Sequence, residues 1–260
     1  IEAVVQFGED IGKPNWVAQN LGRGLSIKEC DNLLTLCSIE KLDRNFLVSI
    51  IVGLVVQNGC DILLEINFSE YSADLVSWLL SHLPLSMRLF EIANTILRQD
   101  IKLFWQFVVI PPFGLDPEID LNYVWNCLVE QTRCVAAVNL FCCSTEQCTV
   151  EDAEIHRVLI KAATMEPNEK IEPDAVKNLI ELLQRNRKIS IKDISDVELI
   201  YLPLLNEYSK VQPKALRYRL SNEPEFFCEL VELLYKKRHA EKHEKVLSEN
   251  MSRRLWEIFY

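Results

Sequence analysis

Three closely spaced cysteines, Cys142, Cys143 and Cys148, are the residues best placed to do chemistry, because their thiolates could bind a metal. A structural zinc site takes four ligands, usually from two short-spaced pairs of Cys or His. No second pair stands nearby, and His156 is the nearest imidazole. We therefore expect no metal here, and interpret the three cysteines as buried thiols at the end of a helix.

A second possible metal pair is His239 and His243, which lie four residues apart and would share one helix face. A zinc protease would carry a glutamate directly after the first histidine, and Ala240 occupies that position. The surrounding basic stretch, residues 236–245, is interrupted by glutamates. This pattern favours a solvated helix face over a metal site.

Carboxylates cluster at Asp116, Glu118 and Asp120, next to a proline-rich segment. Negative charge is favourable before the N-terminus of a helix, and this is the preferred interpretation. An acidic metal site is the alternative. The chain has no Gly-x-Ser-x-Gly nucleophile motif, and we predict no catalytic, cofactor-binding or metal-binding residues, and hence no enzyme.

Composition excludes several classes of ligand. The chain has only 7 glycines, the last of them Gly114, so a glycine-rich phosphate loop is not expected. The net charge of −10 opposes sequence-independent binding to nucleic acids, which needs Lys and Arg to neutralise phosphates. We expect neither a nucleotide cofactor nor a nucleic-acid partner.

Nine cysteines, an odd number, favour reduced thiols and a cytoplasmic protein. The longest nearly unbroken apolar run extends from Phe46 to Val56, and a membrane span needs about 20 residues. We therefore expect a buried helix there and no membrane association. Both ends of the chain are apolar, which suggests a fragment of a larger protein.

Helical periodicity dominates the sequence, because apolar residues recur every three or four positions. Ser26 and Glu29 form a capping box, Asp43 begins a helix that Gly59 ends, and Pro173 suits a first helical turn. Other starts are expected at Ser69, Ser86, Asp120 and Thr149. The expected helices cover residues 26–37, 43–58, 69–83, 86–97, 101–110, 120–128, 134–142, 149–162, 173–183, 190–205, 213–220, 224–235 and 251–260.

The expected fold is all-α: a degenerate α-solenoid of stacked antiparallel helix pairs, similar to HEAT and TPR repeats. Segments 75–97 and 123–141 support it, since both read as a helix, a polar turn and a second helix. A compact all-α domain is the alternative. A proline-rich joint at 111–117 would separate an N-terminal part, 1–110, from a C-terminal part, 118–260.

Aromatic residues are expected mainly in the core. This applies to the five tryptophans, Trp16, Trp78, Trp105, Trp125 and Trp256. Phe226 and Phe227 are expected to share a wide apolar face on one helix. That face would pack residues 194–235 into a three-helix unit.

Residues 194–205, followed by Pro213-Lys214-Ala215-Leu216 and Glu223-Pro224-Glu225-Phe226-Phe227, form a distinctive pattern. It resembles the C-terminal helical-repeat region of large, mostly uncharacterised bacterial proteins, and Trp78 to Pro84 fits the same family. Some of these proteins resemble signal-transducing NTPases of phage defence, so the resemblance implies a sensor region without catalytic residues.

These observations favour a non-catalytic helical-repeat module that binds a protein or peptide, as part of a larger cytosolic protein. Stacked helix pairs offer an extended surface suited to such partners. The alternative is a self-contained all-α enzyme or ligand-binding domain with a pocket between its helices.

Overall fold

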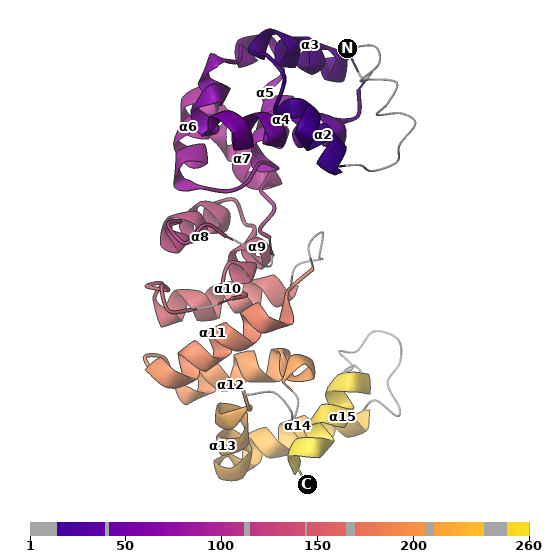
Figure 1. The fold of residues 1–260 in the computed structure, drawn as a ribbon. Helices are drawn as coiled ribbons and strands as arrows, with labels where there is room; N and C mark the ends of the chain where they lie inside the picture. The colour runs from indigo at the N-terminus through magenta and orange to yellow at the C-terminus, as the bar shows by residue number, and fades with distance from the viewer. Residues whose placement is uncertain are drawn as a thin grey trace. The chain divides into compact units, whose positions relative to one another are not determined.

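The computed structural model describes residues 15–39, 42–111, 115–143, 145–164, 170–205, 211–236 and 249–259 (Figure 1). All regular secondary structure in these ranges is helical, which confirms the all-α prediction. None of the described helices is both long and apolar enough to cross a membrane. The chain divides into two compact units, residues 1–120 and 121–260.

Unit 1 is built, over its described residues, from α-helices joined by short 3-10 turns. The α-helices are α2 (Asn15–Gly22), α3 (Ile27–Ser38), α4 (Arg44–Asn58), α5 (Ala73–Ser81), α6 (Met87–Leu97) and α7 (Ile101–Phe107). The 3-10 turns are η1 (Cys60–Glu65), η2 (Phe68–Glu70) and η3 (Arg98–Asp100).

Side-chain caps fix where most helices of unit 1 begin. The capping box before α3 is present as predicted, with Ser26 N donating to Glu29 Oε2 at 2.8 Å. Asp43 accepts from Phe46 N at 3.0 Å and so begins α4. The start predicted at Ser69 is wrong: residues 68–70 form η2, and Ser72 caps α5 instead. Ser72 is the better cap because its side chain can accept from the N3 amide, that of Leu75.

Helices α2 and α4 approach each other so closely that their backbones touch at two glycines. A Cβ atom on Gly22 would lie 1.9 Å from Ile50 O, and one on Gly53 would lie 1.9 Å from Gln19 O. Each helix therefore places a glycine against the backbone of the other. Helix α4 is buried over most of its length, as its apolar run predicts.

An aromatic group within the unit 1 core joins α6 to α7. Phe90 and Trp105 have ring centroids 5.1 Å apart, and Phe104 stands edge-on to Trp105 at 5.1 Å. The helix predicted over residues 101–110 is present but shorter, because α7 ends at Phe107, before Val108.

Unit 2 continues as a series of helices connected by loops. Over its described residues it contains α8 (Leu121–Glu130), α9 (Cys134–Asn139), α10 (Asp152–Thr164), α11 (Pro173–Asn186), α12 (Ile191–Ile200), η4 (Leu202–Leu204), α13 (Lys214–Asn222), α14 (Pro224–Lys236) and α15 (Glu249–Phe259). From α8 to α14, the main contacts join helices that are neighbours or next neighbours along the chain.

Several predicted boundaries in unit 2 differ from the structure: α9 ends at Asn139 rather than near Cys142, and α11 continues to Asn186. Two further differences have a clear cause. Helix α10 begins at Asp152 rather than at Thr149, whose backbone N donates instead to Asn122 Oδ1 at 3.0 Å. Helix α12 ends at Ile200 rather than near Leu205, because Pro203 lacks the amide that an α-helix would need there.

Buried polar side chains tie successive segments of unit 2 together. Asp152, at the start of α10, accepts from Asn186 Nδ2 at 2.9 Å and from Lys188 N at 3.2 Å. Tyr201 donates its hydroxyl to Leu159 O at 2.9 Å. Asn178 donates to Phe141 O at 2.8 Å, at the end of the α9 segment. Asp152 and Asn178 thereby pair backbone groups next to helix ends, which would otherwise lack partners. Tyr201 instead joins the end of α12 to the middle of α10.

The glycine contact between α2 and α4 yields a direct test. Gly53→Ala should lower the free energy of unfolding by roughly 3 kcal/mol or more, because its methyl group would overlap a backbone oxygen that cannot rotate away. Gly24→Ala is the matched control, since the nearest atom to its Cβ would be 3.7 Å away. Chemical denaturation measures both. Equal stability of the two variants would contradict the packing described.

Candidate functional site

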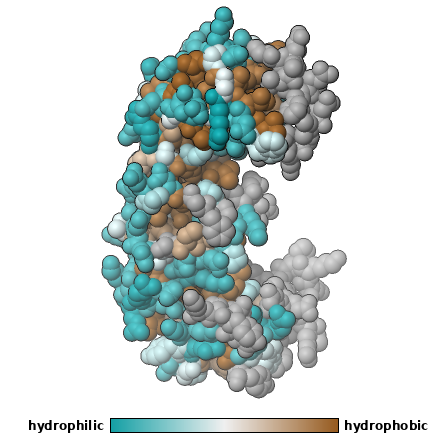
Figure 2. Space-filling view, viewed as in Figure 1, coloured by the Kyte–Doolittle hydropathy of each residue, from teal (hydrophilic) through white to brown (hydrophobic). Residues whose placement is uncertain are grey.

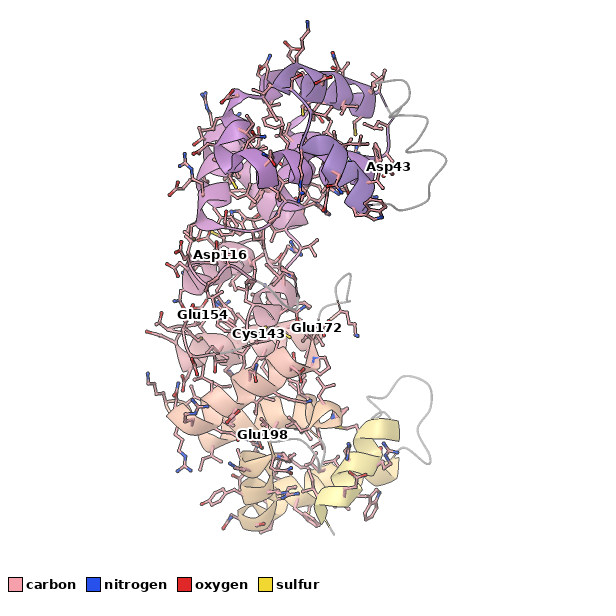
Figure 3. The ribbon with its side chains drawn as sticks, viewed as in Figure 1. Asp43, Asp116, Cys143, Glu154, Glu172 and Glu198 are labelled. Atoms are coloured by element: carbon pink, nitrogen blue, oxygen red, sulfur yellow. The ribbon has the colours of Figure 1, made fainter. Side chains whose placement is uncertain are left out.

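A network of buried polar contacts lies where α11, α12 and α13 meet, around Glu198 (Figure 3). Its centre is Glu198 of α12, a fully buried carboxylate. Glu198 Oε2 accepts from Leu216 N at 2.6 Å, and Oε1 accepts from Ala215 N at 3.2 Å. Oε1 also accepts from Gln184 Nε2 at 2.6 Å, so one side chain joins three helices.

Glu198 acts as the N-terminal cap of α13. The residue at the cap position is Pro213, which has no side chain able to accept a hydrogen bond. The first amides of a helix need acceptors, and Glu198 supplies them from the neighbouring helix. Gln184 completes the junction by donating to Gln212 O at 2.7 Å, on the segment that leads into α13.

Burial raises the pKa of Glu198 above the ordinary glutamate value. The hydrogen bonds from Leu216, Gln184 and Ala215 and the charge of Lys214 act in the opposite direction and offset only part of this effect. A raised carboxyl pKa in a cleft can mark a general acid. Here the carboxylate is fully buried and faces backbone and amide donors, so the geometry assigns it a structural role.

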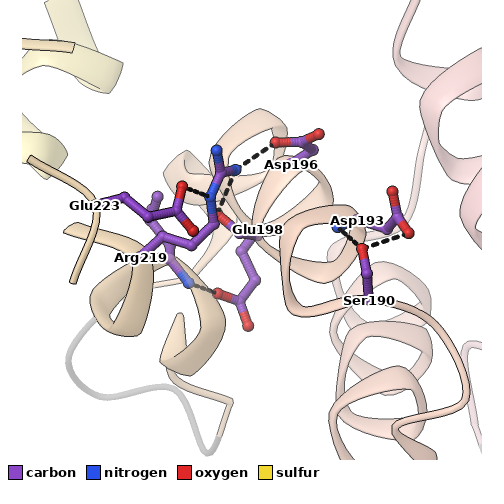
Figure 4. Close-up of polar contacts among 8 residues, drawn as sticks. Ser190, Asp193, Asp196, Glu198, Arg219 and Glu223 are labelled. Carbon is purple, nitrogen blue, oxygen red and sulfur yellow. Dashed lines mark hydrogen bonds and ion pairs between the residues drawn. The ribbon is translucent and has the colours of Figure 1, made fainter. Parts of the chain in front are cut away.

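Arg219 of α13 is the second buried charge of this junction (Figure 4). Its guanidinium donates to Asp196 Oδ1 at 2.8 Å and to Glu223 Oε2 at 3.0 Å. It also lies 3.7 Å from the centroid of the Phe226 ring, in a cation–π contact. Arg219 therefore links α12, α13 and α14 and has two carboxylates to balance its charge.

An apolar cluster lies beside these charges and joins the same elements. Leu202, Leu216, Leu230 and Leu255 are buried together, and Leu199 and Phe226 pack against them. The predicted three-helix unit is thus present, but α15 joins it, which the sequence did not indicate.

The expectation of a wide apolar face on α14 is corrected. Phe226 packs against the leucine cluster, whereas Phe227 is 38% exposed. Adjacent helical positions point about 100° apart, and the inward stripe runs through Phe226 and Leu230, four residues on. The residues of the distinctive sequence pattern at 194–227 therefore serve largely in packing and capping.

The cysteine group does not form a metal site in the structure. No set of three or more His, Cys, Asp or Glu residues among the described residues could hold a metal ion. Burial raises the pKa of Cys142 and of Cys148, which disfavours the thiolate that a metal would need. The interpretation as buried helix-end thiols is wrong: Cys143 is exposed, Cys142 and Cys148 are only half-buried, and all three follow the end of α9 at Asn139. None of the nine cysteines, all of which the structure describes, forms a disulfide.

The other sequence candidates do not converge on one site. His156 Nε2 is buried and has no hydrogen-bond partner among the described residues. His239 and His243 lie outside the described residues. Asp116 Oδ1 accepts from Glu118 N at 2.9 Å, so this carboxylate stabilises its own loop, which ends at Asp120, directly before α8.

The tryptophans divide between core and surface. Trp105 and Trp125 are buried as predicted, and Trp125 packs on Phe141 with ring centroids 5.6 Å apart. The core prediction is wrong for Trp16, which is 70% exposed, and for Trp256, which is 38% exposed. Each lies on a helix with one outward face, which periodicity alone does not distinguish from the inward one.

A serine–histidine contact in unit 1, which the sequence did not predict, resembles the nucleophile and base of some enzymes. Ser81 Oγ and His82 Nδ1 are 3.1 Å apart, beside a pocket of about 720 Å³. Both groups also contact Trp78 O, at 2.8 Å and 2.7 Å. A carbonyl oxygen only accepts, so both donate to it, and His82 Nδ1 cannot remove the serine proton. The pair caps the end of α5 rather than activating a nucleophile.

A second missed feature is a groove of about 460 Å³ in unit 2. It lies between the end of α11 and the starts of α12 and α13, adjacent to Glu198. Apolar side chains make up most of its lining, including Ile189, Ile191, Ile194 and Tyr218. Arg187 and Lys214 add positive charge. In the sequence, the isoleucines and the tyrosine lie among basic residues, and this pattern was the signal that could have indicated a binding surface.

Comparison with known proteins gave no relative: no family model matches the chain, and neither a curated protein nor a solved structure is similar to it.

The role of Glu198 as a cap can be tested by substitution. Glu198→Ala should lower the free energy of unfolding by roughly 2–4 kcal/mol, through a lost helix cap and a buried amide left short of a partner. Glu198→Gln should cost less, because one oxygen remains to accept from Leu216 N. Urea denaturation gives both values.

The pH dependence of the Glu198→Gln comparison follows from the raised pKa. The folded chain holds the Glu198 proton more tightly than the unfolded chain, so this group favours folding below the ordinary glutamate pKa. That contribution is lost as pH rises through the folded-state value. The stability difference between the native chain and Glu198→Gln should therefore shrink from pH 4 upward, and a widening difference would contradict the assignment.

Proposed function

We propose that the chain is a non-catalytic helical-repeat module that binds a protein or peptide partner. One observation carries the proposal. The buried charged side chains Glu198 and Arg219 form hydrogen bonds that hold neighbouring helices together. Glu198 accepts from the first amides of α13, and Arg219 pairs with Asp196 and Glu223. In the described part of the chain, both charged groups therefore stabilise the scaffold instead of facing a substrate.

The arrangement of unit 2 supports a repeat architecture. Its helices from α8 to α14 pack mainly against chain neighbours, which is the contact pattern of stacked helix pairs. In unit 1, α5 and α6 form a comparable pair, as α8 and α9 do in unit 2. A degenerate α-solenoid is the architecture that we propose for this pattern.

Exposed apolar side chains support a binding role. On the face drawn in Figure 2, hydrophobic residues reach the surface between hydrophilic ones. The exposed large hydrophobic residues include Trp16, Val56, Ile191 and Tyr218. Aromatic residues are common anchors at protein interfaces. The resemblance at residues 194–227 adds a sensor role in a larger cytosolic bacterial protein, with anti-phage defence signalling as its setting.

A ligand-binding domain is the second candidate, and the pocket beside His82 is what favours it. The pocket has the size of a small-molecule site and is lined by Cys60, Ser81, His82 and Asp116 among others. Its histidine and serine are both engaged with Trp78 O, which leaves this candidate without an activated group.

Two experiments on the intact chain distinguish peptide binding from small-ligand binding: a phage-display selection and a melting-temperature screen. A random peptide library displayed on phage should yield peptides that bind reversibly, with dissociation constants in the micromolar range. A library of metabolites should leave the melting temperature unchanged. A metabolite that raises the melting temperature, together with no enriched peptide, would contradict the proposed function.

A further inference from the structure

We propose that the groove between α11, α12 and α13 binds a peptide segment in which apolar side chains are flanked by carboxylates. This inference rests on the proposed function, because it assigns the peptide-binding role to one place. The groove is lined by side chains from the end of α11, the start of α12 and the first turns of α13.

The floor and the rim of the groove are apolar and accessible. Ile194 is buried and closes the floor, while Ile191 and Tyr218 are 48% and 55% exposed. Both exposed side chains, Ile191 and Tyr218, form part of the apolar lining of the groove. A partner that filled the groove would also cover these two residues, which favours a peptide over a small enclosed ligand.

The charge at the rim is positive, although the whole chain carries −10. Arg187 and Lys214 line the groove, and neither forms an ion pair among the described residues. Their exposed chain neighbours Lys188, Lys192 and Arg217 have the same sign.

The carboxylates of α12, and Glu223 after α13, each have a partner within unit 2. Asp193 accepts from Ser190 Oγ at 2.6 Å, and that bond lowers the pKa of its carboxyl group. Asp196 and Glu223 pair with Arg219, and Glu198 is buried under α13. The lining of the groove contains two cationic side chains, Arg187 and Lys214, and no carboxylate. A partner with carboxylates on either side of its apolar residues would complement both features.

The groove is held in shape by the Glu198 junction. Gln184 and Ala215 line it, and both donate to Glu198 Oε1. Its walls are thereby fixed before a partner arrives, which reduces the ordering cost of binding.

The test uses a short fluorescein-labelled peptide with a central Leu-Leu-Phe and two Asp or Glu residues on each side. Fluorescence anisotropy with the intact chain should show reversible binding that weakens as ionic strength rises. A matched peptide with Asn and Gln in place of the acids should bind at least about tenfold more weakly. Equal binding of the two peptides would overturn the charge argument.

Variants locate the binding. The double variant Arg187→Gln, Lys214→Gln and the single variant Tyr218→Ala should each weaken the acidic peptide about tenfold or more. The control double variant Arg23→Gln, Lys102→Gln removes the same charge from exposed positions in unit 1, and Leu64→Ala removes an exposed large apolar side chain there. The controls should leave the affinity unchanged. Circular dichroism and melting temperature confirm that every variant is folded.

The outcomes separate this inference from the proposed function. If phage selection yields peptides whose binding the groove variants do not change, the groove is the wrong place and the proposed function stands. If no peptide is selected, both fail. A single-stranded RNA oligonucleotide serves as a further probe. RNA binding that the Arg187, Lys214 variant abolishes and Tyr218→Ala does not would assign the rim to nucleic acid and overturn the peptide proposal.

Discussion

A buried carboxylate that caps a neighbouring helix holds together the junction of α11, α12 and α13. Helix α13 begins after Pro213, which cannot cap it, so its first amides depend on Glu198 of α12. A buried acceptor of this kind is costly unless its donors are in place, and here Gln184, Ala215 and Leu216 supply them. The positions of α11, α12 and α13 are therefore mutually fixed, and the groove at their junction takes its shape from that contact.

Many charged and polar side chains of the described residues are paired with one another or with backbone groups, and none of these pairs forms a reactive centre. Arg219 balances its charge on Asp196 and Glu223, and Asp152 holds the turn that links α11 to α12. The Ser81 and His82 side chains both turn to one carbonyl oxygen at the end of α5. Asp152, Ser81 and His82 satisfy backbone groups at helix ends, which every helical fold must do, and Arg219 links three helices. What they leave at the surface of unit 2 is an apolar groove edged by cations.

Much of the fold could be predicted from the sequence, because caps and periodicity are local. Ser26 with Glu29, Asp43, and Pro173 mark helix starts that the structure confirms. The helix start predicted at Ser69 is wrong because several polar residues precede α5 and any of them could be the cap. Only the structure shows that Ser72 accepts from the N3 amide of α5. The Glu198 cap and the groove could not be predicted, since they join segments that the sequence separates. The backbone contact of Gly22 and Gly53 is of the same long-range kind.

Amide hydrogen exchange at Ala215 and Leu216 tests the central claim most directly. Amides in the first turn of a helix normally lack intrahelical acceptors and exchange readily. If Glu198 caps α13, both amides should exchange as slowly as those in the middle of the helix, and Leu216, with the shorter bond, should be the slower of the two. Exchange of both at the rate of unprotected amides would show that the carboxylate does not hold this helix, and the account of the junction and its groove would be wrong.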